Sequence, residues 1–167
     1  MLNYGPFMHI YFSGSISGGR DDVDLYRAIV ENLRTGGHHV IAGEVTNPEL
    51  HGGGEPLGDQ EIFERDLAWI EEISRLGGVL VAEVSTPSTG VGYEVAAARY
   101  RFRIPVICLY RAGRTQRCSA MVAGDPEITL IRYDKTDMAE LFARLGEVLR
   151  TMDQPANDAG IPASRDL

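Results

Sequence analysis

Cysteine, positive charge and long hydrophobic stretches are all scarce in this chain. Only 2 of the 167 residues are cysteine, which excludes a fold held together by a framework of disulfides. No apolar run approaches the roughly 20 residues of a membrane-spanning helix, and residues 1–7 lack the basic and apolar regions of a signal peptide. We therefore expect a cytoplasmic protein with no membrane partner, and we expect Cys108, in an apolar run, to be a core residue.

Acidic residues outnumber basic ones by 24 to 16, which leaves a net charge of −8. A DNA or RNA polymer is bound through a basic face, so neither is an expected partner. A small anion is still a possible ligand, because a few backbone N–H groups can bind one whatever the overall charge. The spacing of His38, His39 and His51 matches no zinc site, so we expect no metal. No Gly-x-Ser-x-Gly sequence is present either, which argues against acyl transfer.

Short apolar runs alternate with amphipathic segments along most of the chain. The runs predict strands at 8–12, 38–42, 78–83, 105–110 and 128–133, and the segments predict helices near 22–35, 59–75, 91–103 and 136–149. Strands that alternate with helices indicate an α/β fold, a doubly wound parallel sheet of five strands with helices on both faces. We expect one domain over residues 1–150 and a polar, disordered tail over residues 151–167.

The loop after the first predicted strand is rich in glycine and serine. Backbone N–H groups in such a loop can bind a phosphate, and Gly14, Ser15 and Gly19 are the preferred donors. The loop matches neither the G-x-G-x-x-G pattern nor the Walker pattern. Many glycine and serine loops without these patterns bind no ligand, so the loop alone is weak evidence for a phosphate site. Asp21 or Asp22 can cap the helix that follows, and both would repel a phosphate at the helix tip itself.

Two other loops are candidates for functional segments. Residues 43–58 form a long polar loop, which in a compact domain is usually either mobile or functional. Arg111, Arg114 and Arg117 form a basic loop after the fourth predicted strand. These arginines either attract an anionic substrate or, as we expect, are simply solvated.

Glu94 ends the run 87–94 (PSTGVGYE), which links a buried strand to a helix. In open parallel sheets, ligands lie just outside the carboxyl ends of the strands, where this run is expected. A carboxylate in the first helical turn is stabilised by the macrodipole, so we expect Glu94 to stay ionised. Glu94 is therefore a candidate nucleophile or electrostatic stabiliser. Glu83, at the end of the third predicted strand, is equally well placed.

Asp66 is a second unusual carboxylate, in the middle of the predicted helix 59–75. Its neighbours three and four residues away are Ile62, Phe63, Trp69 and Ile70. An acid on an apolar stripe is partly desolvated, which raises its pKa and favours the protonated form.

Asp66 and Glu94 are thus expected to have pKa values shifted in opposite directions. Such divergence is typical of an acid and a nucleophile that act together, as in the cleavage of a glycosidic bond. Tyr11, near the end of the first predicted strand, could reach the same crevice. The same pattern is also consistent with two other interpretations: Asp66 and Glu94 serve only as caps, and Tyr11 is a core tyrosine.

Five sequence segments occur in a recognisable order: 10–20 (IYFSGSISGGR), 64–69 (ERDLAW), 81–84 (VAEV), 87–94 (PSTGVGYE) and 118–121 (CSAM). Together they resemble one family, the 2′-deoxynucleoside 5′-monophosphate N-glycosidases, which are relatives of the nucleoside 2-deoxyribosyltransferases. The resemblance runs from about Met8 to Tyr133 and implies a Rossmann-like fold, a homodimer, and no cofactor or metal. Family members often carry arginine at the position of Ser17, so the chain departs from the pattern there.

The resemblance also implies roles for individual residues. Glu94 would be the nucleophile on C1′ of the deoxyribose, giving a glycosyl-enzyme intermediate. Asp66 would position the sugar and protonate the departing base, and Tyr11 would orient the carboxylate. Ser119 would come from the partner subunit to bind the same 5′-phosphate as Ser15, Gly19 and Ser88. The implied substrate-binding and phosphate-binding set is Gly14, Ser15, Ile16, Ser17, Gly18, Gly19, Arg20, Ser88, Gly90, Ser119 and Met121.

The expected activity is hydrolysis of a small nucleotide, a 2′-deoxynucleoside 5′-monophosphate, to a free base and 2-deoxyribose 5-phosphate. Base exchange on unphosphorylated deoxynucleosides is the nearest alternative, and the serines implied to bind phosphate argue against it. A ribonucleotide N-glycosidase of the CMP type is another alternative. A nucleotide-sensing module of the same fold would not need both Asp66 and Glu94.

Overall fold

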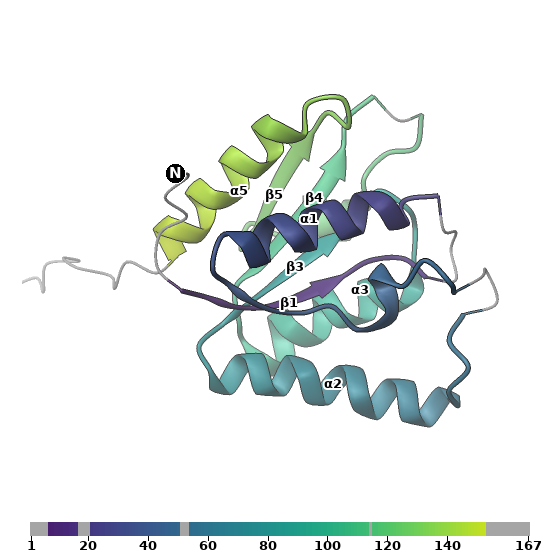
Figure 1. Ribbon diagram of the computed structural model, residues 1–167. Coiled ribbons are helices and arrows are strands. Elements are labelled where there is room, and N and C mark those ends of the chain that lie inside the picture. Colours follow the sequence, from purple (N-terminus) through teal and green to yellow (C-terminus); the bar gives the residue numbers. More distant parts are fainter. Residues whose placement is uncertain (1–6, 17–20, 51–53, 114, 153–167) are drawn as a thin grey trace, which may run out of the picture.

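The computed structural model describes residues 7–16, 21–50, 54–113 and 115–152. A five-stranded, fully parallel sheet forms the centre of the molecule, in the order β2-β1-β3-β4-β5 (Figure 1). This arrangement confirms the predicted α/β fold with a doubly wound parallel sheet. The strands are β1 (His9–Ser13), β2 (His39–Ile41), β3 (Val79–Glu83), β4 (Val106–Arg111) and β5 (Ile128–Tyr133).

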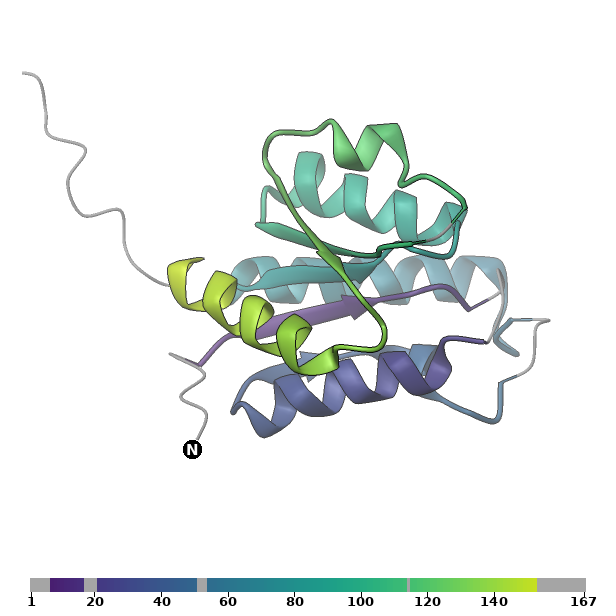
Figure 2. The same cartoon turned by 90° about the horizontal axis from the view of Figure 1, so that it is seen from above.

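Helices cover both faces of the sheet (Figure 2). On one face α1 (Val23–Thr35) and α5 (Met138–Met152) bury one hydrophobic cluster, which includes Tyr26 and Leu145. On the other face α2 (Asp59–Arg75) and α3 (Thr89–Ala96) bury a second cluster, which includes Cys108, fully buried as predicted. The short elements are the 3₁₀ helix η1 (Gly43–Thr46), the π-helical η2 (Ala97–Phe102) and α4 (Ala120–Ala123).

The helix that carries Glu94 begins earlier than the sequence predicts. Ser88 is its N-cap, and the Ser88 hydroxyl accepts a hydrogen bond from the backbone N–H of Val91 at 3.3 Å. Since α3 therefore begins at Thr89, Glu94 lies in the second turn, and the expectation that it lies in the first turn is wrong. The electrostatic field of the helix N-terminus falls off within the first turn, so it adds little to the stability of the ionised form of Glu94.

The strand order places a topological switch between β1 and β3. These strands are neighbours in the sheet, with Ser13 in register with Ala82, but their connections run to opposite sides. Ligands of doubly wound proteins bind in the crevice outside the carboxyl ends of the strands at such a switch. The fold therefore predicts a ligand site at the residues that end β1 and in the loops around them.

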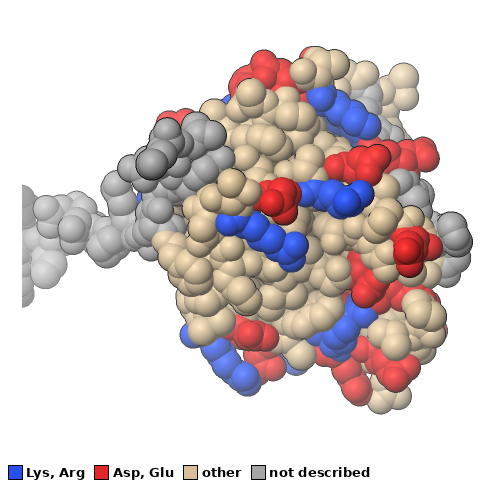
Figure 3. Space-filling view, viewed as in Figure 1, with Lys and Arg blue, Asp and Glu red and all other residues tan. Residues whose placement is uncertain are grey.

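The face of the molecule in Figure 3 carries no extended basic patch. Acidic and basic side chains are interspersed over the face in Figure 3, consistent with the net charge of −8. Of the helices in the described part of the chain, none is both long enough and apolar enough to cross a membrane.

Gly78 permits the close approach of β1 and α2 to the start of β3. A Cβ atom at this position would lie 2.2 Å from the carbonyl oxygen of His9 and 2.7 Å from Cγ2 of Ile73. The backbone of a paired strand cannot move aside, so Gly78→Ala is expected to lower the free energy of unfolding by roughly 2–3 kcal/mol. Urea-induced unfolding followed by circular dichroism measures this loss.

The matched control for this prediction is Gly92→Ala in α3. A Cβ atom on Gly92 would meet nothing within 4 Å, and alanine favours a helix by about 1 kcal/mol over glycine. This variant is expected to unfold at an equal or higher urea concentration than the wild type. Equal midpoints for the Gly78 and Gly92 variants would contradict the prediction.

Candidate active site

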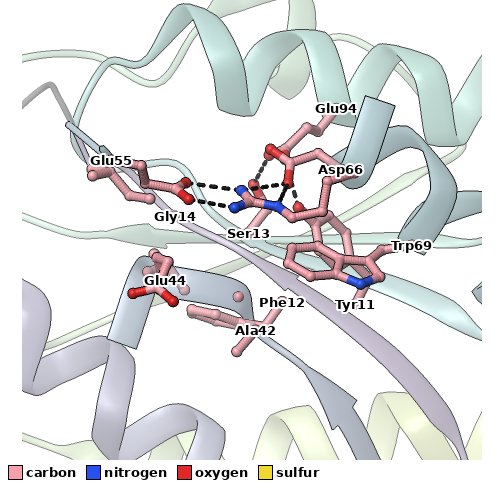
Figure 4. Close-up of a pocket in the computed structure, with 14 residues that line it drawn as sticks. Tyr11, Phe12, Ser13, Gly14, Ala42, Glu44, Glu55, Asp66, Trp69 and Glu94 are labelled. Carbon is pink, nitrogen blue, oxygen red and sulfur yellow. Dashed lines mark hydrogen bonds and ion pairs between the residues drawn. The ribbon is translucent and has the colours of Figure 1, made fainter. Parts of the chain in front are cut away.

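Two hydroxyl groups from β1 hold the carboxylate of Glu94. Tyr11 donates its hydroxyl proton to Oε1 of Glu94 at 2.6 Å, and Ser13 donates to Oε2 (Figure 4). Tyr11 and Ser13 are two residues apart on one strand, so their side chains point to the same face of the sheet. The end of β1 and the second turn of α3 thus fix both oxygens of one carboxylate.

Burial raises the pKa of Glu94 above its ordinary value. The hydrogen bonds from Ser13 and Tyr11 oppose this shift because they stabilise the charged form, whereas the nearby Asp66 charge adds to it. The pKa of Asp66 is also raised, again chiefly by burial. The raised pKa predicted for Asp66 is confirmed, but the opposite shift predicted for Glu94 is wrong, because desolvation acts on both groups.

Arg65 lies between Asp66 and Glu55, a residue of the loop before α2. Its guanidinium donates to Oδ1 of Asp66 at 2.8 Å and 3.0 Å, and it forms a two-pronged pair with Glu55, one arm of which measures 2.9 Å. The guanidinium carbon also lies 4.6 Å from the ring centroid of Trp69. Sequence reasoning missed Arg65, Glu55 and Ser13 as site residues.

A small polar cavity connects these groups. It has a volume of about 30 Å³ and is lined by the three residues predicted to be catalytic and by the Arg65 cluster. A larger apolar groove of about 610 Å³ adjoins it and shares Asp66 and Glu94 as lining residues. The two carboxylates therefore lie where a polar cavity meets an apolar groove. The polar cavity is lined by Tyr11, Phe12, Ser13, Gly14, Ile16, Ala42, Gly43, Glu44, Val45, Glu55, Arg65, Asp66, Trp69 and Glu94.

The apolar groove is formed by the facing surfaces of α2 and α3. Phe63 and Tyr93 are about half exposed there, and their ring centroids lie 6.1 Å apart. Gly90, one of the predicted substrate-binding residues, lines the same groove. A flat, hydrophobic group that binds next to Asp66 and Glu94 would therefore find aromatic surface here.

Part of the predicted glycine and serine loop reaches the polar cavity. Gly14 and Ile16 line it, whereas Ser15 is completely buried, and its hydroxyl has no hydrogen-bond partner among the described residues. A Cβ atom on Gly14 would lie 3.0 Å from a methyl group of Val45, so the loop packs closely against η1. The predicted phosphate-binding residues Ser17, Gly18, Gly19 and Arg20 lie outside the described residues.

Ser88 and Ser119 come together in a second groove of about 350 Å³. Both serines belong to the same chain, and the groove runs along the start of α3 and the end of the preceding loop. Met121 is 84% exposed on the neighbouring α4. The structure thus brings these two predicted phosphate ligands together, separately from the polar cavity that contains Gly14 and Ile16.

Glu83, the positional rival of Glu94, is completely buried and does not line the polar cavity. It accepts hydrogen bonds from the hydroxyl groups of Ser85 and Tyr133, the latter at 3.0 Å. The Ser85 hydroxyl also accepts a hydrogen bond from the backbone N–H of Arg111 at 2.7 Å. Through these hydrogen bonds, Glu83 stabilises the loop that leads from β3 to α3.

Asp22 and Arg111 differ from their predicted roles. Asp22 occupies the N-cap position of α1, but its side chain does not cap the helix. Its carboxylate instead accepts hydrogen bonds from Arg111 at 2.6 Å and from Thr86 at 3.1 Å. The Arg111 side chain is only 16% exposed, so the expectation that it is solvated is wrong. Arg117 is exposed, and Arg114 lies outside the described residues.

The missed site residues differ in how far the sequence indicated them. Ser13 lies two residues after Tyr11 in a strand, so strand alternation could have placed it beside Glu94. Arg65 is next to Asp66, but adjacent residues on a helix do not face each other, and only a long side chain folded back makes the contact. Glu55 lies in an irregular loop, and no sequence pattern indicated that it belongs to the site.

Several known proteins are similar to this chain, although no family model matches it. A protein of Syntrophotalea carbinolica, whose name assigns it to the 2′-deoxynucleoside 5′-phosphate N-hydrolases, is 43% identical over 148 residues, which cover 89% of this chain and 99% of that protein. The 5-hydroxymethyl-dUMP N-hydrolase of Mus musculus is 44% identical over 133 residues, covering 78% of this chain and 72% of that protein. Homologous proteins of this kind therefore span most of the chain.

A solved structure of a CMP N-glycosidase from Clostridium botulinum has a similar fold. It superimposes with a TM-score of 0.57 at 13% sequence identity, and the match covers 84% of this chain and 98% of that one. This similarity supports the α/β architecture alone.

Proposed function

Because the chain belongs to the 2′-deoxynucleoside 5′-phosphate N-hydrolase family, we propose that it hydrolyses 2′-deoxynucleoside 5′-monophosphates. The products are a free nucleobase and 2-deoxyribose 5-phosphate. The observation that carries the proposal is the pair of carboxylates, Glu94 and Asp66, on the border of one cavity at the switch point of the sheet. Two carboxyl groups that flank a glycosidic bond are the usual machinery for its cleavage.

In the proposed first step, the ionised Glu94 attacks C1′ of the deoxyribose. The bond between C1′ and the base breaks, and protonated Asp66 donates its proton to the departing base. The two hydroxyls that hold the Glu94 carboxylate support this role, because they stabilise its charged form and aim both oxygens. The raised pKa of Asp66 supports its role as the acid.

In the proposed second step, water hydrolyses the ester between C1′ and Glu94. Asp66, now ionised, accepts a proton from this water while the water oxygen attacks C1′. The products are 2-deoxyribose 5-phosphate, an ionised Glu94 and a protonated Asp66, so the enzyme returns to its starting state. No cofactor or metal takes part in either step.

The grooves around the carboxylates suggest how a nucleotide would bind. The base would lie against the aromatic surface of Phe63 and Tyr93, next to Asp66. The 5′-phosphate would be bound by the glycine and serine loop after β1 and by Ser88. We further propose a homodimer in which Ser119, besides sharing a groove with Ser88 of its own chain, contributes to the phosphate site of the partner protomer. The high exposure of Met121, close to Ser119, supports an interface on this surface.

Base release from a panel of nucleotides tests the proposed activity. The protein is incubated with each dNMP, each NMP and each deoxynucleoside, with and without an added acceptor base, and the products are separated by chromatography. We expect release from at least one dNMP without an acceptor. Release from none of the compounds would exclude hydrolysis, and turnover only when an acceptor base is present would identify a transferase.

Ser119→Ala is expected to weaken binding of monophosphates selectively. Loss of one hydrogen bond to a charged phosphate costs about 1.5–3 kcal/mol, so KM for a dNMP should rise roughly 10-fold to 100-fold. KM for the matching deoxynucleoside should stay within about twofold of the wild-type value, since this substrate has no phosphate for Ser119 to bind. Ser119→Thr keeps a hydroxyl and should restore much of the affinity. An equal increase for both substrate classes would argue against a phosphate contact.

Tyr11→Phe is expected to move the acidic limb of the pH profile of kcat/KM. Glu94 must be ionised to attack, so activity is lost as the pH falls through its pKa. The variant removes one hydrogen bond to the charged carboxylate, so the pKa of Glu94 should rise and the limb should move to higher pH by about one unit. Tyr100→Phe, which removes an exposed hydroxyl bonded to Asp125, should leave the limb in place. An unchanged limb in Tyr11→Phe would contradict the prediction.

A further inference from the structure

Arg65 is one cation shared between two carboxylates of the active site. It forms ion pairs with Asp66 on its own helix and with Glu55 on the loop before that helix. The side chains of Arg65, Asp66 and Glu55 are 22%, 20% and 4% exposed, respectively. Charged groups this poorly hydrated interact strongly, because little water screens them. The contrast on the same helix is Arg75 with Glu71, a pair that is 73% and 48% exposed.

The position of the Arg65 guanidinium is fixed from several directions. Consecutive residues on a helix point away from each other, so its contact with Asp66 requires the side chain to fold back. The Trp69 ring lies under the guanidinium at 4.6 Å, and Gly43 of η1 packs against that ring so closely that a Cβ atom would lie 2.8 Å away. The arrangement is therefore a built feature of α2, η1 and the loop.

The charges that face Asp66 come from every surrounding element. Arg65 on α2 is the cation, Glu55 on the loop and Glu94 on α3 are acids, and Glu44 on η1 and Tyr11 on β1 line the same cavity. Acids thus outnumber the single cation in the described part of this cavity. A full ion pair with Arg65 favours the charged form of Asp66, and a competing anion beside Arg65 weakens that pair.

We propose that Arg65 and Glu55 are positioning residues that set when Asp66 carries the proton it donates to the departing base. This inference rests on the proposed hydrolase reaction. While the guanidinium is shared with Asp66, that carboxyl group is held ionised and oriented toward the sugar. When the guanidinium is drawn fully to Glu55, Asp66 takes up a proton from solvent water and can donate it to the departing base. After cleavage, Asp66 accepts one proton from the attacking water, so each cycle returns the proton that Asp66 donated.

Two substitutions at the ends of this network should shift the behaviour of Asp66 in opposite directions. Asp66 must be protonated to act as the acid, so activity is lost as the pH rises through its pKa. Arg65→Gln removes the cation and should move this basic limb of kcat/KM to higher pH by about one unit. Glu55→Gln removes the competing anion, leaves Arg65 to Asp66 alone, and should move the limb to lower pH.

The pKa of Asp66 can also be measured directly, without substrate. A ¹³C NMR titration of the side-chain carboxyl groups, with Asp66 assigned by its loss in Asp66→Asn, should show the same opposite shifts. Arg75→Gln, which breaks the exposed pair with Glu71 on the same helix, is the matched control and should shift neither measurement. Arg65→Lys keeps the charge and should return the basic limb most of the way to its wild-type position.

The outcomes separate this inference from the proposed function. If the wild type releases base from no dNMP, the proposed function fails, and the NMR titration still tests the effect on Asp66. If the wild type is active but Arg65→Gln and Glu55→Gln shift Asp66 in the same direction, or not at all, the inference is overturned. Should Arg65→Gln fail to fold, the downward shift in Glu55→Gln and its absence in Arg75→Gln decide the question.

Discussion

Replacement of Glu94 by glutamine is expected to lower kcat for a dNMP by at least about 10³-fold. The amide oxygen of glutamine is a poor nucleophile and cannot form the glycosyl ester from which the sugar is released. The substitution keeps the shape of the side chain, and the amide oxygen can still accept the hydrogen bond from Tyr11. Initial rates of base release with the wild type and the variant measure the loss.

The fold should survive this replacement. Burial raises the pKa of Glu94, so folding is opposed by its charge once the pH exceeds the ordinary value of 4.5. This cost grows until the pH reaches the higher pKa of the folded state, and glutamine removes it. At neutral pH, Glu94→Gln should therefore unfold at the same or a higher urea concentration. Glu140→Gln, an exposed change on α5, serves as the control for both measurements.

A direct test of the intermediate accompanies this prediction. Wild-type enzyme quenched with acid during turnover should carry a mass increase equal to one 2-deoxyribose 5-phosphate residue, on the peptide that contains Glu94. The Glu94→Gln enzyme should carry none. Activity within tenfold of the wild type in Glu94→Gln would remove Glu94 from the role of nucleophile, and a labelled peptide elsewhere would reassign that role.

Asp66→Asn is expected to reduce kcat/KM for a dNMP by about 10²-fold to 10⁴-fold, the usual contribution of a positioned general acid. Asparagine keeps the size of the side chain and its ability to hydrogen-bond the sugar, but it cannot supply a proton to the departing base. Steady-state rates over a range of dNMP concentrations measure the effect.

The size of the defect should depend on the leaving group. In a 2-deoxyribose 5-phosphate glycoside with an activated aryl group, the leaving group departs without a proton. In the first turnover, before water attacks the glycosyl ester, Asp66→Asn should therefore release the aryl group at a rate near that of the wild type. Glu94→Gln should stay inactive toward the same compound, because its defect is in the attack on C1′. An equal loss for natural and activated substrates would show that Asp66 positions the sugar and does not donate the proton.

Local pattern predicted the five strands and the long helices of this fold with small errors at their ends, but it did not predict the short η1 and α4. The predicted helix 59–75 and the predicted strand 128–133 match α2 and β5, because apolar periodicity reports directly which face of an element is buried. The start of α3 was misjudged by two residues, since the Ser88 cap was not recognised. That small error had a large consequence, because it moved Glu94 out of the first turn and removed the reason for expecting a permanently ionised carboxylate.

Pairings between elements were harder to predict than the elements themselves. Tyr11 and Glu94 are 83 residues apart in the sequence and their side chains bond at 2.6 Å, a contact indicated only by the family resemblance. Asp22 was placed correctly at a helix start, yet its side chain bonds Arg111, 89 residues away, in preference to its own helix. No local pattern carries such a choice, because it depends on which charges the sheet brings to one edge.

The sequence by itself determined the five strands, the helices between them, and a desolvated acid at Asp66. It left Glu83 and Glu94 equal in position. The family resemblance favoured Glu94, and the tertiary structure supplies the physical difference between the two. Glu83 is buried in the interior, where it accepts hydrogen bonds from Ser85 and Tyr133, whereas Glu94 lines the cavity beside Asp66. The physical reason is that burial and charge pairing arise from contacts between distant segments, so the pKa of a carboxyl group is a property of the packed molecule.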